Sequence, residues 1–327
     1  MLAGENHMKA GLLAVACLSL AACASDAVEE ETSDTVAEWP GLPADKAAQI
    51  AAIGPVIDPP ASIAVVQGMV DAPPYDDVTV ASDIAYGDDP AQRLDVYTEN
   101  AADNAASRPV LLFVHGGGFV GGSKAGDGFY PQNVTAFAAR NGMVGVNMEY
   151  RFAPAAQWPA GRDDLAAAIQ WVRDNIADYG GDPDQVVLFG HSAGASHVAD
   201  YVQHADLHGP EFASVKGALL LSPYYTAIDG EDHVYYGSDT AAHTADAAIA
   251  RLGAVKVPLM LAYAEHDREQ FTSFAQTVES RLCSEGASGN CPTMLLLKGH
   301  NHITEGATIG SVDQSLSGPF MEWVRGL

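Results

Sequence analysis

The chain has 327 residues, of which 48% are hydrophobic and 18% are charged, so it is long and apolar enough to bury a substantial core. Intrinsic disorder of the whole chain is therefore excluded. The 16 Lys and Arg residues against 42 Asp and Glu residues give a net charge of −26, which repels phosphate backbones and anionic membrane surfaces, so nucleic-acid binding is not expected.

Residues 1–22 are predicted to be a lipoprotein signal peptide. Lys9 precedes an apolar run over residues 10–20, which is too short to span a bilayer but is typical of a signal-peptide core. The run leads into Leu20-Ala21-Ala22-Cys23, which resembles the lipobox of bacterial lipoproteins. The resemblance implies a lipid on Cys23 as the only membrane attachment, and an outer-membrane lipoprotein of the bacterial cell envelope. The rival interpretation is a plain secretory signal that yields a periplasmic or secreted protein.

Residues 23–74 are predicted to form a tether followed by an N-terminal flap. This segment is acidic at first and then rich in Ala and Pro, with short helices expected over residues 44–53 and 62–70. The pattern changes after this segment, and we expect one α/β domain over residues 75–327.

In that domain, apolar runs of strand length alternate with longer helical patterns, which indicates a mostly parallel eight-stranded sheet with helices on both faces. The runs at 111–114 and 186–189 are wholly apolar, as expected of central strands that are buried on both sides. The expected strands are 78–86, 93–97, 110–114, 143–150, 185–189, 217–221, 258–263 and 293–297, and the expected helices are 133–141, 163–179, 193–204, 268–282 and 311–324. The expected helix at 163–179 begins with Asp163 and Asp164, and acidic residues suit the positive end of a helix dipole.

A histidine and three glycines, His115-Gly116-Gly117-Gly118, follow the strand at 110–114. Consecutive glycines let backbone N–H groups point into a cavity, as stabilisation of a tetrahedral oxyanion requires. The competing interpretation is a phosphate loop, but Gly121-Gly122-Ser123-Lys124 lacks the residue order that places a lysine on a nucleotide phosphate. We expect His115 to brace this loop and not to transfer protons.

The motif Gly190-His191-Ser192-Ala193-Gly194 lies between a buried strand and a helix. A serine on such a sharp turn needs small flanking residues, and the turn presents its hydroxyl above the edge of the sheet. Ser192 is therefore the candidate nucleophile.

A serine nucleophile needs a histidine base and a carboxylate that orients the histidine, and both are expected on loops after later strands. The segment after the strand at 258–263 offers Glu265, Asp267 and Glu269, of which we select Asp267 because Glu269 is expected to begin the next helix. The last strand is followed by His300 and His302, and either could reach the serine.

The four cysteines have different predicted fates. Cys17 lies in the signal peptide and Cys23 carries the lipid, which leaves Cys283 and Cys291 on either side of a short turn. In an oxidising periplasm these two are expected to form a disulfide, worth about 2.5 kcal/mol in the chain-entropy model. The alternative is a pair of free buried thiols.

Together the motifs make residues 76–327 resemble the α/β-hydrolase fold carboxylesterases, near their hormone-sensitive-lipase-like and kynurenine-formamidase-like branches. The run Tyr150-Arg151-Phe152-Ala153-Pro154 is part of the resemblance and implies structural support behind the oxyanion loop. The resemblance also implies site roles by position: Ser192 as nucleophile, Asp267 as acid and His302 as base, with oxyanion donors from the backbone of Gly117, Gly118 and Ala193.

The chain departs from the lipase-like branch in two places. That branch usually has Asp-Pro-Leu at the acid, whereas Asp267 is followed by Arg268 and Glu269. The expected cover over the site is also small, consisting of the segment before Tyr75 and an insertion at 223–250. A thin cover favours an open site for short acyl groups, in which Tyr224, Tyr225, Tyr235 and Tyr236 are candidate lining residues.

The expected function is hydrolysis of small short-chain acyl esters through an acyl-enzyme intermediate, without a cofactor. An arylformamidase-like amide hydrolase and a feruloyl or acetylxylan esterase use the same triad and are the alternatives within the enzyme class. A zinc hydrolase built on His266, Asp267, His300 and His302 is a second class, and a non-catalytic surface binding protein is a third.

Overall fold

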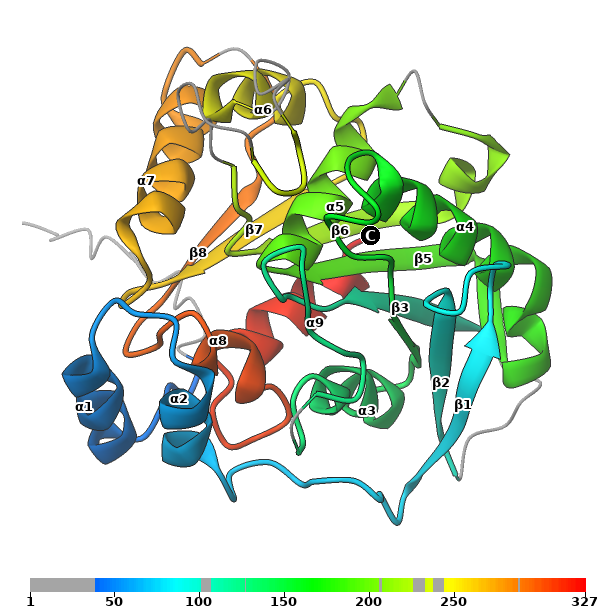
Figure 1. Ribbon diagram of the computed structural model, residues 1–327. Helices are drawn as coiled ribbons and strands as arrows, with labels where there is room; N and C mark the ends of the chain where they lie inside the picture. The colour runs from blue at the N-terminus through cyan, green and yellow to red at the C-terminus, as the bar shows by residue number, and fades with distance from the viewer. Residues whose placement is uncertain are drawn as a thin grey trace, which may run out of the picture. The chain divides into compact units, whose positions relative to one another are not determined.

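The computed structural model describes residues 39–100, 107–126, 128–205, 208–225, 233–237, 244–287 and 289–327. Eight strands there form one sheet in the order β1-β2-β4-β3-β5-β6-β7-β8 (Figure 1). Strand β2 runs antiparallel to β1 and β4, and the other neighbours pair in parallel. The strands are β1 (Val78–Ala85), β2 (Arg93–Glu99), β3 (Arg108–Val114), β4 (Val144–Met148), β5 (Gly181–His191), β6 (Val215–Leu221), β7 (Leu259–Ala264) and β8 (Thr293–Leu297). Every expected strand is confirmed.

Helices cover both faces of this sheet. Those described are α1 (Ala44–Ile53), α2 (Pro59–Val66), α3 (Gln132–Arg140), α4 (Ala160–Asn175), α5 (Ala193–Gln203), α6 (Ala245–Leu252), α7 (Glu269–Val278), α8 (Thr304–Ala307) and α9 (Ser317–Arg325). In β3, Leu112 and Val114 pack into the core shared with α4 and α5, whereas Leu111 and Phe113 pack into the core shared with α3 and α9. The period of two explains why this strand is apolar throughout, since each of its faces meets a layer of helices.

Several predicted helix boundaries differ from the observed ones, and two of the differences have a local reason. Helix α2 begins at Pro59, and not at residue 62, because the Asp58 side chain accepts a hydrogen bond from the Ala61 N–H and the prolines suit the first helical positions. Helix α9 begins at Ser317, and not at residue 311, because residues 304–307 form α8 and the chain turns before α9. Helix α4 begins at Ala160, three residues before the predicted start.

The N-terminal part of the described chain is closely associated with the sheet domain. Residues Trp39–Leu327 form one compact unit, and Figure 1 shows α2 between α1 and α8. The Ser62 hydroxyl accepts a 2.8 Å hydrogen bond from the side-chain amide of Asn301, and both groups are fully buried. Helix α2 is therefore a wall of the domain at the edge where the last strand ends.

Cys283 and Cys291 are joined by a disulfide, which confirms the predicted pair. Cys23 and the predicted signal peptide lie outside the described residues. None of the helices that the structure describes has the length and apolar character needed to cross a membrane.

Candidate active site

Ser192 occupies a strained turn between β5 and α5. Its φ of +55° and ψ of −123° lie outside the regions that most side chains adopt. The flanking glycines are required by close backbone contacts: a Cβ on Gly190 would lie 2.5 Å from the Ala195 Cα, and one on Gly194 would lie 2.1 Å from the Val114 carbonyl oxygen. The turn directs the Ser192 side chain into a pocket at the carboxyl edge of the sheet.

The structure brings the three predicted triad side chains together. His302 Nε2 lies 2.8 Å from Ser192 Oγ, and His302 Nδ1 lies 2.9 Å from Asp267 Oδ2. The remaining carboxylate oxygen of Asp267 accepts a 2.8 Å hydrogen bond from the Arg268 N–H. Because Asp267 accepts from Nδ1–H, the Nε2 lone pair is free to receive the serine proton.

The other candidates for the acid and the base lie elsewhere. Glu265 is exposed and accepts a hydrogen bond from the Gly299 N–H, and Glu269 begins α7 on the surface. His300 is fully buried, with Nε2 3.0 Å from Asp313 Oδ2. The contacts of the two rings therefore distinguish them: His302 faces Ser192, and His300 faces Asp313.

The three predicted oxyanion donors line the same pocket as Ser192. Gly117 and Gly118 have φ values of +140° and +60°, and a Cβ on Gly117 would lie 1.8 Å from the Gly121 carbonyl oxygen. In the described part of the chain, neither glycine N–H has a hydrogen-bond partner. Ala193 is the first residue of α5, where a backbone N–H has no partner within the helix. These amides are available to a developing oxyanion.

His115 holds the oxyanion loop in place, as predicted. Its Nδ1 lies 2.7 Å from the Gly116 carbonyl oxygen, and its Nε2 lies 3.0 Å from Glu149 Oε2. Glu149 also accepts hydrogen bonds from the Lys124 N–H and the Ser123 hydroxyl. The Tyr150 hydroxyl donates to the His115 carbonyl oxygen at 2.9 Å, so the loop is fastened at several points to the end of β4.

The predicted reason for an acid at position 164 was wrong. Asp164 has no exposed surface, and it accepts hydrogen bonds from both the backbone and the guanidinium of Arg151 and from the Gln92 side chain. Its carboxylate therefore ties the segment after β4 to α4, whereas the exposed Asp163 remains the acid of the first helical turn. Arg151 has the structural role that the sequence implied.

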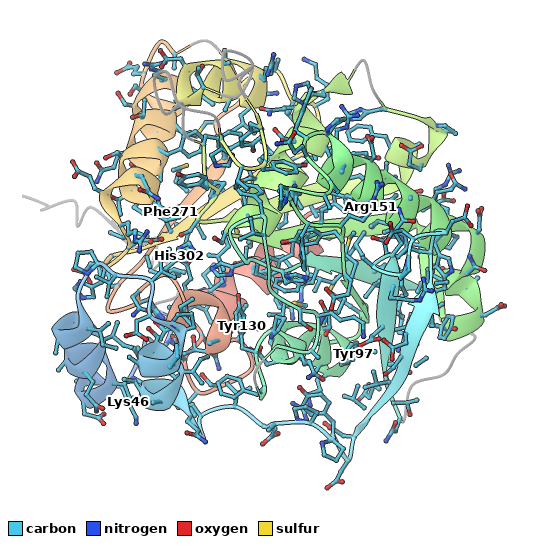
Figure 2. All side chains as sticks on the ribbon, in the orientation of Figure 1. Lys46, Tyr97, Tyr130, Arg151, Phe271 and His302 are labelled. Carbon is cyan, nitrogen blue, oxygen red and sulfur yellow. A yellow bond between two sulfur atoms is a disulfide. The ribbon has the colours of Figure 1, made fainter. Side chains whose placement is uncertain are left out.

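The pocket around Ser192 has a volume of about 570 Å³. Its walls combine the oxyanion loop with side chains from α7 and from the segment around α2, namely Phe271, Ile57, Pro59 and Ile63. The Phe271 ring lies 4.3 Å from the His302 ring between centroids, and Figure 2 shows the two side chains next to each other at the base of α7. No carboxylate lines the pocket in the part of the chain that the structure describes.

Only part of the expected cover lines the pocket. Tyr224 and His233 contribute to its wall. Tyr235 and Tyr236 are buried behind it, where Tyr235 stacks on Phe119 with ring centroids 4.7 Å apart, and Tyr225 is buried against Phe274. The prediction that all four tyrosines line the site is therefore wrong for three of them, because their rings fill the core beneath the cover.

The roles of two buried residues behind His302, namely His191 and Glu305, were missed in the sequence. His191 Nδ1 lies 2.6 Å from the Tyr130 hydroxyl, and its Nε2 lies 2.8 Å from the His302 carbonyl oxygen. Glu305 is fully buried and accepts a hydrogen bond from the Ser222 hydroxyl at 3.1 Å. Burial lowers the pKa of His191 well below its usual value, so its neutral ring orients the backbone of the base. A glutamate at position 305 in a four-residue helix gives no periodic signal that could have revealed it.

The four ligands of the zinc alternative do not converge. His300 pairs with Asp313, and His266 lies partly exposed near Glu265. Among the described residues, the acidic and histidine side chains that approach one another at ligand spacing are His191, His302 and Glu305. Each of these is already hydrogen-bonded to protein groups.

Comparisons with known proteins find sequence similarity to esterases and other hydrolases over part of the chain. The BD-FAE family model matches residues 94–214. Esterase LipC of Mycobacterium tuberculosis is 40% identical over 111 residues, which are 34% of this chain and 27% of LipC. Phenmedipham hydrolase of Pseudarthrobacter oxydans is 36% identical over 124 residues, which are 36% of this chain and 24% of that hydrolase. The chain thus spans only about a quarter of the length of these curated relatives.

Solved structures match a larger part of the chain. A structure from a study of two fungal esterases of Rhizomucor miehei has a TM-score of 0.64 at 21% identity, and the match covers 88% of this chain and 98% of that one. Inhibited esterase B from Lactobacillus rhamnosis has a TM-score of 0.61 at 20% identity, covering 78% of this chain and 89% of that one. With its sheet order and the serine turn after β5, the chain therefore has the α/β-hydrolase fold.

Proposed function

We propose that this chain is a serine carboxylic-ester hydrolase that acts on short-chain acyl esters. The observation that carries the proposal is the hydrogen-bonded triad of Ser192, His302 and Asp267. Its serine faces a pocket in which the backbone N–H groups of the oxyanion loop are free. The similarity to LipC and to the esterase structures supports the same reaction class. The wall formed by Phe271, Ile57 and Ile63 is apolar and suits an apolar acyl group.

The geometry supports a two-step reaction. Ser192 Oγ attacks the ester carbonyl carbon while His302 Nε2 takes the hydroxyl proton, and the carbonyl oxygen becomes an oxyanion beside the N–H groups of Gly117, Gly118 and Ala193. The C–O bond to the alcohol then breaks, and the alcohol leaves with the proton from His302. Water repeats the attack on the acyl-serine, returns a proton to Ser192 and releases the acid. Asp267 remains ionised and stabilises the imidazolium in both steps.

Hydrolysis of a nitrophenyl ester series from acetyl to decanoyl tests this proposal. Wild-type protein and Ser192→Ala should be compared, each with and without a chelator. We expect chelator-insensitive activity that declines with chain length and falls by about 10⁴-fold or more in Ser192→Ala. Activity that survives in Ser192→Ala, or that the chelator abolishes, would contradict the proposal. Formanilide and feruloyl ester substrates in the same assay distinguish the amide and feruloyl alternatives.

We also propose that the protein is held at the bacterial cell envelope by a lipid on Cys23. The proposal rests on the apolar run and Leu20-Ala21-Ala22-Cys23 in the sequence. Expression of the full chain in a bacterium, followed by detergent phase partitioning, should place the wild type in the detergent phase and Cys23→Ala in the aqueous phase. An unchanged distribution of Cys23→Ala would contradict the lipid anchor.

A further inference from the structure

A second carboxyl group lies beside the histidine of the site. Glu305 is on α8, three residues after His302, and has no exposed surface. Its Oε2 accepts the hydrogen bond from Ser222, whereas its Oε1 has no hydrogen-bond partner among the described residues. Glu305 Oε1 lies 3.9 Å from His302 Nδ1 and 3.4 Å from His191 Nε2.

Glu305 and Asp267 therefore face the same ring nitrogen at different distances. Asp267 Oδ2 is within hydrogen-bond distance of His302 Nδ1 at 2.9 Å, and Glu305 Oε1 is beyond that distance at 3.9 Å. An approach of about 1 Å would bring Glu305 into a normal hydrogen bond, which is within the range of side-chain adjustment. The unpaired Oε1 loses no existing hydrogen bond in such a movement.

The charges around Glu305 explain why it is not the acid in the intact site. Burial, and then the nearby charge of Asp267, raise the pKa of Glu305 well above its usual value. The other titratable groups that face it are His191, His302 and Tyr130, and burial keeps His191 neutral. Two ionised carboxylates at one imidazole repel each other, so Asp267 carries the charge and Glu305 keeps its proton.

We infer that Glu305 is a reserve acid for His302, a positioning residue that can hold Nδ1–H when Asp267 cannot. This inference rests on the proposed function. Removal of the Asp267 carboxylate takes away the second cause of the raised pKa of Glu305 and leaves burial, the larger one. Glu305 then releases its proton to solvent only as the pH rises, and its carboxylate accepts the hydrogen bond from His302 Nδ1. The site then keeps a correctly oriented base at reduced efficiency.

The experiment compares nitrophenyl acetate hydrolysis by Asp267→Ala with that by the double variant Asp267→Ala/Glu305→Gln between pH 5 and 10. Alanine is used because an asparagine would occupy the space and hold the ring in the wrong tautomer. The matched control is Asp267→Ala/Glu269→Gln, which removes an exposed acid from α7 with the same change of charge. Glu305→Gln alone and the wild-type protein complete the double-mutant cycle of positions 267 and 305.

We expect kcat of Asp267→Ala to exceed that of the Glu305 double variant by about 10-fold or more, with kcat of the Glu269 control unchanged from Asp267→Ala. We also expect the rate of Asp267→Ala to rise with pH through an ionisation that is absent from the Glu305 double variant. The pH profile of Asp267→Ala is measured with Glu305 unaltered, and the profile of the Glu305 double variant supplies the comparison.

Equal kcat values and pH profiles for Asp267→Ala and the Glu305 double variant would overturn the inference. The inference would also be overturned if Glu305→Gln lowered kcat by the same factor in the wild-type background as in the Asp267→Ala background. Equal losses would indicate that Glu305 has a purely structural role. Failure of the proposed function would differ from both results, since wild-type protein would then show no activity that depends on Ser192.

Discussion

Two histidine–carboxylate pairs lie at the same edge of the sheet and present their rings to different groups. His302 pairs with Asp267 at 2.9 Å, and His115 pairs with Glu149 at 3.0 Å. The difference lies in the second ring nitrogen. In His302 that nitrogen faces Ser192 Oγ, whereas in His115 it faces the carbonyl oxygen of Gly116 in the same loop. A carboxylate partner alone therefore does not identify a catalytic histidine.

His300 provides a third case within the last loop. Its Nε2 pairs with Asp313 at 3.0 Å, and its Nδ1 is buried without a hydrogen-bond partner in the described part of the chain. The ring faces neither the pocket nor the oxyanion loop, so we interpret the pair as structural. The four predictions below test these assignments, beginning with the largest expected effect.

The largest effect is expected from Asp267→Asn. An asparagine amide would donate to His302 Nδ1 and favour the tautomer that cannot accept the serine proton. We expect kcat for nitrophenyl acetate to fall by about 10³- to 10⁴-fold, with the thermal midpoint within a few degrees of wild type. Glu265→Gln is the matched control, and a comparable loss in that variant would show that the acid has been assigned incorrectly.

A smaller loss is expected from Glu149→Gln. Glu149 accepts from His115, the Ser123 hydroxyl and the Lys124 N–H, and a glutamine offers one acceptor oxygen to these three donors. The oxyanion loop should loosen, and kcat should fall by about 10- to 100-fold, which is less than the cost of deleting an oxyanion donor. A loss as large as that of Asp267→Asn would mean that the His115 pair takes part directly in proton transfer.

Asp200 tests how a buried carboxyl group that is not paired with a histidine changes the free energy of unfolding. Burial raises its pKa to about 7 from 3.8, despite hydrogen bonds from Gln203 and Tyr236. Between about pH 4 and pH 7 the unfolded chain loses this proton while the folded chain retains it, so the free energy of unfolding falls as pH rises.

Asp200→Asn should therefore stabilise the protein by a few kcal/mol at pH 8 and should give no such gain at pH 4. Urea unfolding at the two pH values measures the difference. An equal effect at both pH values would contradict the shifted ionisation.

The smallest effect is expected from Asp313→Asn. Burial alone would raise the pKa of Asp313, but the hydrogen bond and charge of His300 hold it below its usual value, so its stabilisation is lost as pH falls through the acid range. We expect the variant to lose about 1–2 kcal/mol of stability at pH 7, to be less sensitive to acid, and to keep kcat within about 2-fold. A large fall in kcat without unfolding would show that His300 assists the reaction.

The serine turn and the oxyanion loop could be predicted because local backbone geometry fixes both. Ser192 needs a turn between two glycines, and Gly117 and Gly118 need positive φ, so the residue types themselves carry the information. Asp267 and His302 follow the last two strands, and parallel strands bring their ends to the same edge. The central strands were predicted for a different reason, because burial on both faces makes their sequences continuously apolar.

The parts that the sequence did not predict depend on contacts between distant segments. Glu305 reaches Ser222 across 83 positions, and Asn301 reaches Ser62 across 239. The role of Asp164 could not be inferred from its helix, because its partners Arg151 and Gln92 lie outside that helix. Such polar contacts leave no periodic pattern in a single sequence.

Covalent labelling of Ser192 tests the central claim most directly. A fluorophosphonate reacts with a serine only where a base activates the hydroxyl and donors stabilise the resulting oxyanion. We predict that intact-mass analysis finds one label per wild-type chain, located on the peptide that contains Ser192, and none on Ser192→Ala. An unlabelled wild type, or equal labelling of Ser192→Ala, would contradict the assignment of Ser192 as an activated nucleophile.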